Sequence, residues 1–237
     1  MTDFQKNDSK EYIKAWTKNS KQHYDDGDYD WLCNLIEPYY YVLEIGCGAG
    51  LSTLALVQRE HRVLSVDINT FALQNTKDLL TENSYIAKIV TESVNLNENN
   101  VCLWNADVVV NRYEINAVTS QLCLDLILLC NPGGNLNSNL LKTEVELLKQ
   151  YGFTQEEIDF RYKQNAIPLL HKYSMISAAA DIAINAKKPL VIVERGDKTI
   201  VNNTLEQIAI DTGMTLVSKI FREIQKITRR WNTTWRH

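Results

Sequence analysis

The stretch VLEIGCGAG, residues 42–50, decides the fold of this chain. An apolar run ends at an acid, Glu44, and glycine then occupies every second position, at Gly46, Gly48 and Gly50. Glycine has no Cβ, so Gly46 and Gly48 allow a tight turn and the close approach of a ligand to the backbone, while Gly50 lets the following helix pack closely. The stretch therefore predicts a strand, a ligand-binding turn and a helix.

Two common nucleotide-binding motifs do not fit this turn. The dinucleotide fingerprint G-x-G-x-x-G would require a third glycine where Leu51 stands, and no G-K-[ST] follows for a triphosphate loop. The pattern present is acid-x-G-x-G-x-G.

Short apolar runs and longer amphipathic runs alternate on both sides of this stretch. We expect strands at 41–45, 62–66, 101–104, 124–130, 190–193 and 215–221, and helices at 51–58, 70–83, 173–186 and 203–212, the last capped by Gly213. Residues 224–231 fit a strand or a helix. This alternation predicts a Rossmann-like three-layer α/β/α sandwich with a mostly parallel central sheet.

The length of 237 residues predicts a single domain. Residues 1–40 are expected to form an N-terminal helical cap or lid, and residues 41–237 the Rossmann-like core. About 60 residues separate the expected fourth and fifth strands, more than the roughly 30 that a βαβ unit requires. We therefore expect a helical insertion at about 135–172, with helices at 140–150 and 155–170.

Composition restricts the setting and the partners. The net charge of −4 gives no general attraction to nucleic acid or acidic lipid, no run reaches the roughly 20 apolar residues of a membrane helix, and five cysteines without paired spacing favour a cytoplasmic location. No metal is expected.

Basic residues and tryptophans gather near the C-terminus, including Arg229, Arg230, Trp231 and Trp235. That segment is either a solvated surface or a contact for nucleic acid.

Three further motifs follow the glycine-rich turn. Asp67 ends the second expected strand, Asn105-Ala106-Asp107 follows the third, and Asn131-Pro132-Gly133-Gly134 follows the fourth. Together with residues 44–50, they resemble the class I S-adenosylmethionine-dependent methyltransferases over about residues 41–194.

The resemblance implies S-adenosylmethionine as cofactor. Glu44 would bind its ammonium, directly or through water, the backbone of the turn would approach the amino-acid tail, and Asp67 would accept from the ribose diol. Asp107 would accept from the adenine amino group, with Ile68 on the ring face. The implied cofactor-binding residues are Glu44, Gly46, Cys47, Gly48, Gly50, Asp67, Ile68, Ala106, Asp107 and Asn131. The residues alone leave open a solvated strand end for Glu44 and helix caps for Asp67 and Asp107.

Three residues are candidates for the transfer step. Asn131 and the Pro132 carbonyl match part of a motif of amino-group methyltransferases and could both accept from an acceptor amine, although Asn-Pro-Gly-Gly is also a good turn. His23 and Tyr24 could close over the cofactor, and His23 could act as a base or simply lie on the surface.

The expected function is an S-adenosylmethionine-dependent methyl transfer to a small-molecule or peptide acceptor, at nitrogen if Asn131 contributes. The alternatives are a DNA or RNA base N-methyltransferase, a catalytically silent partner protein that only binds the cofactor, and an enzyme that transfers the aminocarboxypropyl arm. Proximity and orientation alone can account for much of such a transfer barrier, so a fixed set of catalytic residues is not required.

Overall fold

The computed structural model describes residues 10–91, 94–130, 149, 154–157, 167–193, 206, 209–215, 217, 218 and 220. The elements are α1 (Lys10–Asp25), α2 (Asp28–Ile36), β1 (Tyr41–Ile45), α3 (Leu51–Gln58), β2 (Arg62–Asp67), α4 (Thr70–Glu82), β3 (Ala87–Val90), β4 (Val101–Asn105), α5 (Arg112–Gln121), β5 (Leu126–Cys130), α8 (Ile167–Ala186) and β6 (Leu190–Val193).

The strands form one six-stranded sheet in the order β3-β4-β2-β1-β5-β6. Every pair of neighbours is parallel, and β1 lies between β2 and β5, with Val42 opposite both Val63 and Leu126. The chain leaves β1 toward β2 and later returns to the other side of β1 as β5. The switch point of the sheet therefore lies between β1 and β5, where ligands of such folds bind beyond the carboxyl ends of the strands.

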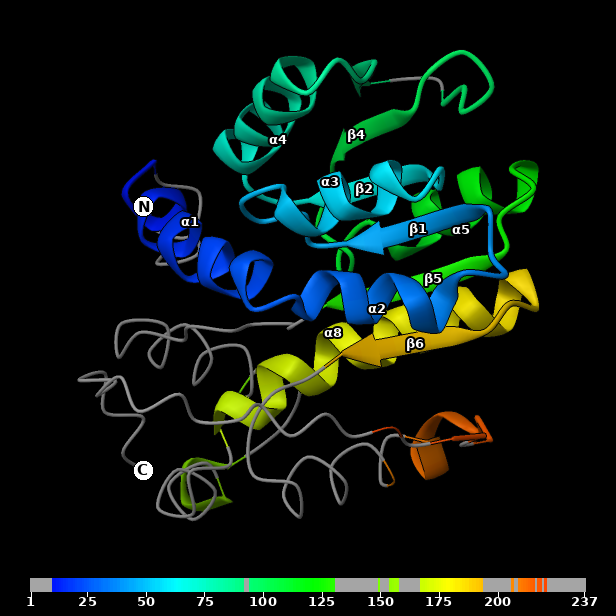
Figure 1. The fold of residues 1–237 in the computed structure, drawn as a ribbon. Helices are drawn as coiled ribbons and strands as arrows, with labels where there is room; N and C mark the ends of the chain where they lie inside the picture. Colours follow the sequence, from blue (N-terminus) through cyan, green and yellow to red (C-terminus); the bar gives the residue numbers. More distant parts are fainter. Residues whose placement is uncertain are drawn as a thin grey trace.

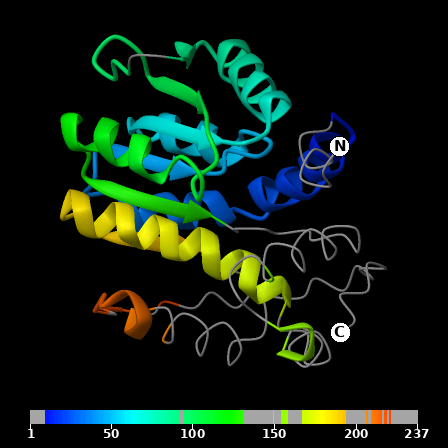
Figure 2. The same ribbon diagram turned by 180° about the vertical axis from the view of Figure 1, so that it is seen from behind.

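Helices cover both faces of the sheet. Side chains alternate across β1, so Val42 faces a core formed with α2, α3 and α4, whereas Leu43 faces a core formed with α5 and α8. Figure 1 shows α2 and α3 in front of the sheet, and Figure 2 shows α5 and α8 from the opposite side. The expected three-layer α/β/α architecture with a parallel sheet is confirmed.

Most expected elements of the core are confirmed, several to the residue. β1, β6 and α3 have the expected bounds, β2 and β4 each extend one residue further, and α4 ends one residue earlier. β5 begins at Leu126 rather than at residue 124, and α8 begins at Ile167 rather than at residue 173. Gly213 has a φ of 72° and its N–H donates to the carbonyl of Ile210, as expected for the end of a helix.

Two elements were not expected. The edge strand β3 has only four residues, one of them an exposed lysine, so it lacks the continuous apolar run of a central strand. The helix α5 fully buries only Ile115 and Thr119, and most of its other side chains are polar.

At 215–221, where a strand was expected, the described residues adopt none; the rest of that range and residues 224–231 lie outside the described residues. The helical insertion also lies almost wholly outside them.

The N-terminal segment forms two helices, as expected for a cap. α1 lies beyond the carboxyl ends of the strands, at the arrowheads of the sheet in both views (Figures 1 and 2). It packs on α2, α3 and α4, and Ile13 joins the core on that face. Among the described helices, none combines the length and apolar character that crossing a membrane requires.

Candidate functional site

The glycine-rich turn joins β1 to α3 at the carboxyl edge of the sheet, and its three glycines have different surroundings. A Cβ at Gly46 would meet no described residue within 4 Å, so the turn is open on that side. A Cβ at Gly48 would lie 2.5 Å from Nε1 of Trp16, and one at Gly50 would lie 2.9 Å from the backbone of Thr76. Ligand approach is therefore possible at Gly46, whereas Gly48 and Gly50 allow close packing within the protein.

Asp67 at the end of β2 is tied to this turn. Its Oδ2 accepts from the N–H of Gly48 at 3.0 Å, and its Oδ1 accepts from the N–H of Asn69 at 2.8 Å. The helix that follows is capped by Asn69, which accepts from Phe71 and Ala72, so the interpretation of Asp67 as the cap is wrong. The carboxylate of Asp67 remains partly exposed at the end of β2, beside the turn.

Glu44 lies inside the protein rather than at a solvated strand end. Its side chain is fully buried, and it accepts from Ser52 Oγ and Thr53 Oγ1 at 2.6 Å each and from Ser65 Oγ at 3.1 Å. Burial raises the pKa of this carboxyl above its ordinary value, an effect that the three hydroxyl donors oppose. In this geometry Glu44 fixes the first turn of α3 to the sheet, and a direct contact with a cofactor ammonium stays a prediction.

The thiol of Cys47 faces inward from the turn. It is buried, and its Sγ lies 3.6 Å from Oδ2 of Asp67. Burial, with the nearby negative charges of Asp67 and Glu44, raises the pKa of Cys47 well above 9.0. The thiol is therefore protonated at neutral pH and serves as a weak donor to Asp67 rather than as a nucleophile.

The residues expected to surround the adenine follow β2 and β4. Ile68 is 40% exposed, and Ala106 is buried. Oδ1 of Asp107 accepts from the N–H groups of Val109 and Val110, so Asp107 organises the turn that leads to α5. Asn105 donates to the carbonyls of Asp67 and Ile68 and links the two strand ends. The structure thus gathers these residues at one edge, while their contacts to adenine stay predictions.

The candidates for the transfer step are dispersed. His23 is buried at the junction of α1 and α2, with Nδ1 2.7 Å from Asp28 Oδ2, so it is not a surface residue. The hydroxyl of Tyr24 donates to Gln58 at the far end of α3, about 10 Å along that helix from the turn. Closure of Tyr24 over the cofactor stays a prediction, and Asn131 lies outside the described residues.

Two sets of contacts at this site were missed in the sequence. Trp16 lies against the turn at Gly48, and the sequence analysis did not single it out. The spacing of Ile13, Trp16, Ser20 and His23 at three, four and three residues marks the inner face of a helix and was the available signal. Likewise, Ser52, Thr53 and Ser65 interrupt apolar runs opposite a strand acid, as partners of a buried carboxylate do.

The arrangement fits S-adenosylmethionine. Open space lies beside the backbone at Gly46, a partly exposed carboxylate stands at Asp67, and an exposed aliphatic side chain follows at Ile68. These features suit an amino-acid tail, a ribose diol and an adenine face. When bound, this cofactor would supply a methyl group on a sulfonium.

Comparison with known proteins concerns the fold. No family model matches the chain, and no curated protein matches it. Solved structures do. Magnesium protoporphyrin IX methyltransferase from Synechocystis, solved with bound SAM, is 14% identical, with 87% of this chain and 75% of that one covered and a TM-score of 0.42. The methyltransferase domain of a bacterial Hen1 is 12% identical, with 81% and 86% covered and a TM-score of 0.44.

A third structure, from Staphylococcus aureus and described as a caffeoyl-CoA O-methyltransferase, is 17% identical with a TM-score of 0.34; the match covers 48% of this chain and 49% of that one. Two further matches cover 43% and 24% of their chains. The parallel sheet, with its switch point beside β1, defines a Rossmann-like α/β fold. The likeness concerns this fold and assigns neither substrate nor reaction.

Proposed function

We propose that this protein binds S-adenosylmethionine at the β1–α3 turn and transfers its methyl group to a small-molecule or peptide acceptor. One observation carries the proposal: the carboxylate of Asp67, at the end of β2, is held 3.0 Å from the Gly48 amide of a turn that is open at Gly46. A carboxylate and an uncovered glycine backbone at a sheet switch point suit a ligand with a diol and an amino-acid tail.

Charge supports the acceptor class. The net charge of −4 offers no general attraction for a polyanion, so a small molecule or a peptide is the proposed acceptor. The features that would favour a nucleic-acid base, Asn131-Pro132 and the basic tail, lie outside the described residues. Transfer to a base is therefore an outcome of the test below.

Binding is tested by calorimetry with S-adenosylhomocysteine. We expect the wild-type chain to bind and Asp67→Ala to lose at least about tenfold in affinity, because the ribose would lose a charged acceptor. Asp67→Asn keeps one oxygen that can accept the hydrogen bond from Gly48, so it serves as the control for any loss of protein stability in Asp67→Ala. Unchanged affinity in a folded Asp67→Ala protein would contradict the ribose assignment.

The acceptor is tested with cofactor labelled in its methyl group. The label is supplied to the protein in a cell extract, which is then separated into nucleic acid, protein and small molecules. We expect the label in the small-molecule fraction, or in the protein fraction if the acceptor is a peptide. Label in nucleic acid would favour the base methyltransferase. Cofactor binding without transfer into any fraction would favour a silent binding partner.

A further inference from the structure

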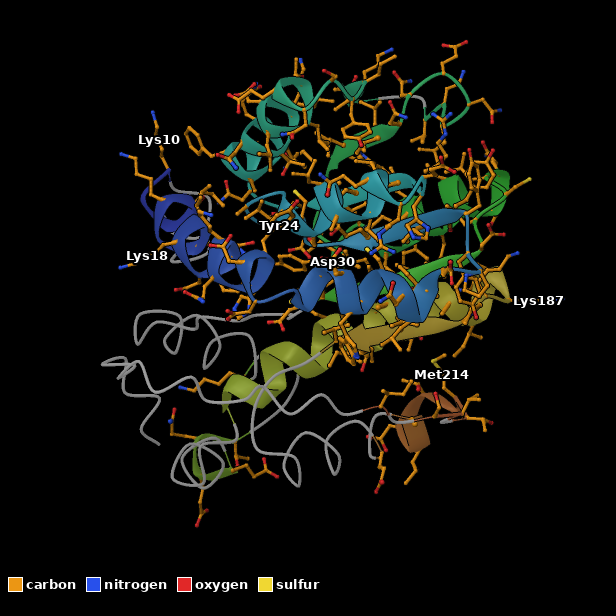
Figure 3. All side chains as sticks on the ribbon, in the orientation of Figure 1. Lys10, Lys18, Tyr24, Asp30, Lys187 and Met214 are labelled. Atoms are coloured by element: carbon orange, nitrogen blue, oxygen red, sulfur yellow. The ribbon has the colours of Figure 1, made fainter. Side chains whose placement is uncertain are left out.

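The outer face of α1 carries a row of lysines, which we call the lysine stripe: Lys10, Lys14, Lys18 and Lys21. Their spacing of four, four and three residues places them on one side of the helix, and all four are exposed. Figure 3 shows Lys10 and Lys18 pointing away from the body of the protein. The other side of α1 faces the core through Ile13. Residues 10–21 contain four lysines and a single acid, so this solvent-facing surface is positive.

Most of this positive charge has no described partner. Lys21 pairs with Asp25 at 2.9 Å, whereas Lys10, Lys14 and Lys18 form no ion pair with any described residue. The other acids at the junction of α1 and α2 do have partners, in the pairs Asp26 with Gln22, Asp28 with His23 and Asp30 with Arg59. Among the described side chains of α1 and this junction, the unpaired charge is thus positive, in a chain whose net charge is −4.

The lysine stripe lies near the edge of the sheet at which an acceptor of the proposed reaction would arrive. α1 lies beyond the carboxyl ends of the strands (Figures 1 and 2), and Trp16 on its inner side lies against the turn at Gly48. A helix diameter of about 10–12 Å therefore separates the stripe from the proposed donor site. A small acceptor bound at the turn would not touch the stripe. An acceptor that contacts both has to be a chain that reaches across α1.

The length and charge of the stripe suit an acidic peptide segment better than a nucleic acid. From Lys10 to Lys21 the stripe is about 17 Å long, at the rise of about 1.5 Å per helical residue. A DNA duplex of that length carries on the order of ten negative charges, far more than the lysines can balance. The net charge of −4 also opposes the approach of such a polyanion. A short peptide segment with a few acidic residues matches the stripe in both length and charge.

We propose that the lysine stripe is a docking surface for an acidic segment of a peptide or protein acceptor. The acceptor residue lies at least about four residues from that segment, because an extended chain covers about 3.3 Å per residue and has to span one helix diameter. This inference rests on the proposed function and deepens it, since it takes the acceptor to be a peptide rather than a small molecule. The stripe raises the rate of association and contributes no contact to the cofactor.

The first test measures binding of a fluorescein-labelled hexaglutamate peptide by fluorescence anisotropy. We expect binding that weakens as salt is added, and a loss of at least about tenfold in affinity in Lys14→Glu/Lys18→Glu. The matched control is Lys88→Glu/Lys187→Glu, which makes the same change of net charge at two exposed lysines outside α1. Lys187 lies on the opposite side of the molecule from α1 (Figure 3), so the control should bind like the wild type. Equal losses in the two double variants would overturn the stripe as the docking surface.

A short DNA duplex is the comparison probe in the same measurement. We expect it to bind more weakly than hexaglutamate, because most of its charges would have no lysine opposite them. Tighter binding of the duplex, lost in Lys14→Glu/Lys18→Glu, would overturn the peptide assignment and make nucleic acid the partner of the stripe.

The second test repeats the labelled-methyl transfer in a cell extract with the stripe variant. We expect label in the protein fraction, reduced at least about fivefold with Lys14→Glu/Lys18→Glu, while the affinity of this variant for S-adenosylhomocysteine is unchanged. Equal protein label with the variant and the wild type, or label confined to small molecules, would overturn the docking surface alone. Failure of the wild type to bind S-adenosylhomocysteine would overturn the proposed function as well.

Discussion

At the scale of single residues, Glu44 is a buried acid that holds the first turn of α3 to the sheet. Three hydroxyl groups, from Ser52, Thr53 and Ser65, all donate to its carboxylate. We expect Glu44→Ala to lower the free energy of unfolding by about 3 kcal/mol, because it leaves these buried hydroxyls without their acceptor. Glu44→Gln retains one acceptor oxygen and should cost clearly less, which urea unfolding of the two variants would show.

The pH dependence of Glu44 has a definite sign. The folded state holds the proton more tightly than the unfolded state, because burial raises the pKa above 4.5. The stability contribution of this group is therefore fully present below the unfolded pKa and is lost as pH rises through the folded value. We expect Glu44→Gln to be less destabilised, relative to the wild type, at pH 8 than at pH 5. A difference between the two proteins that does not change with pH would contradict this assignment.

His61 has the opposite dependence. Its Nδ1 lies 2.6 Å from the carbonyl of Tyr39, its Nε2 has no partner among the described residues, and burial lowers its pKa below 6.5. The unfolded chain therefore gains a proton before the folded one, so stability falls as pH drops below 6.5. We expect His61→Asn, whose amide reproduces the Nδ1 donor, to abolish this loss. Thermal melts of both proteins at several pH values between 7.5 and 5, a range that brackets the ordinary histidine pKa of about 6.5, would show whether the loss of stability disappears in the variant.

At the scale of elements, alanine substitutions at Gly50 and Gly213 distinguish the energetic cost of backbone strain from that of steric crowding. Both have positive φ, 84° and 72°, but a Cβ at Gly50 would strike the Thr76 backbone at 2.9 Å, whereas one at Gly213 would meet no described residue within 4 Å. Gly213→Ala should therefore cost about 1 kcal/mol, the backbone term alone. Gly50→Ala should cost about 3 kcal/mol, because α3 must also move away from α4. Equal losses in chemical denaturation would mean that α3 and α4 can separate at no cost.

How far the sequence predicted these elements depended on what each segment packs against. β1 and β6 were placed to the residue because their apolar character is continuous, and α3 because the glycines mark its start. β3 was missed because an edge strand with an exposed Lys88 looks like loop. α5 was missed because only Ile115 and Thr119 are buried.

The site was predictable where its residues are local. Gly46 and Asp67 follow from motifs at strand ends. The contact between Trp16 and Gly48 depends on how α1 packs against the turn. The sequence indicates only that Trp16 lies on the inner face of a helix, not which residue it contacts. The hydroxyl partners of Glu44, which are Ser52, Thr53 and Ser65, were not predicted because they come from two other elements.

At the scale of the whole molecule, the sheet order sets a gradient of stability. β1 is paired on both sides and buried from Val42 to Ile45, whereas β3 and β6 are the outermost of the described strands and their residues are mostly half-buried. Amides of central parallel strands open only when the fold opens globally, whereas edge strands open locally at lower cost. We expect hydrogen exchange to be slowest in β1, β2 and β5 and faster in β3 and β6.

The same exchange measurement tests the site without any assay of activity. Added S-adenosylhomocysteine should slow exchange at the turn, residues 46–50, and at 67–69, because the proposed ligand would hold these two strand ends. At a concentration of about 100 times its dissociation constant, it should also slow the central strands by the factor that corresponds to about 2.7 kcal/mol, since it binds only the folded state. Protection of β1, β2 and β5 without added protection at 46–50 and 67–69 would contradict the assignment of the ligand site to this turn.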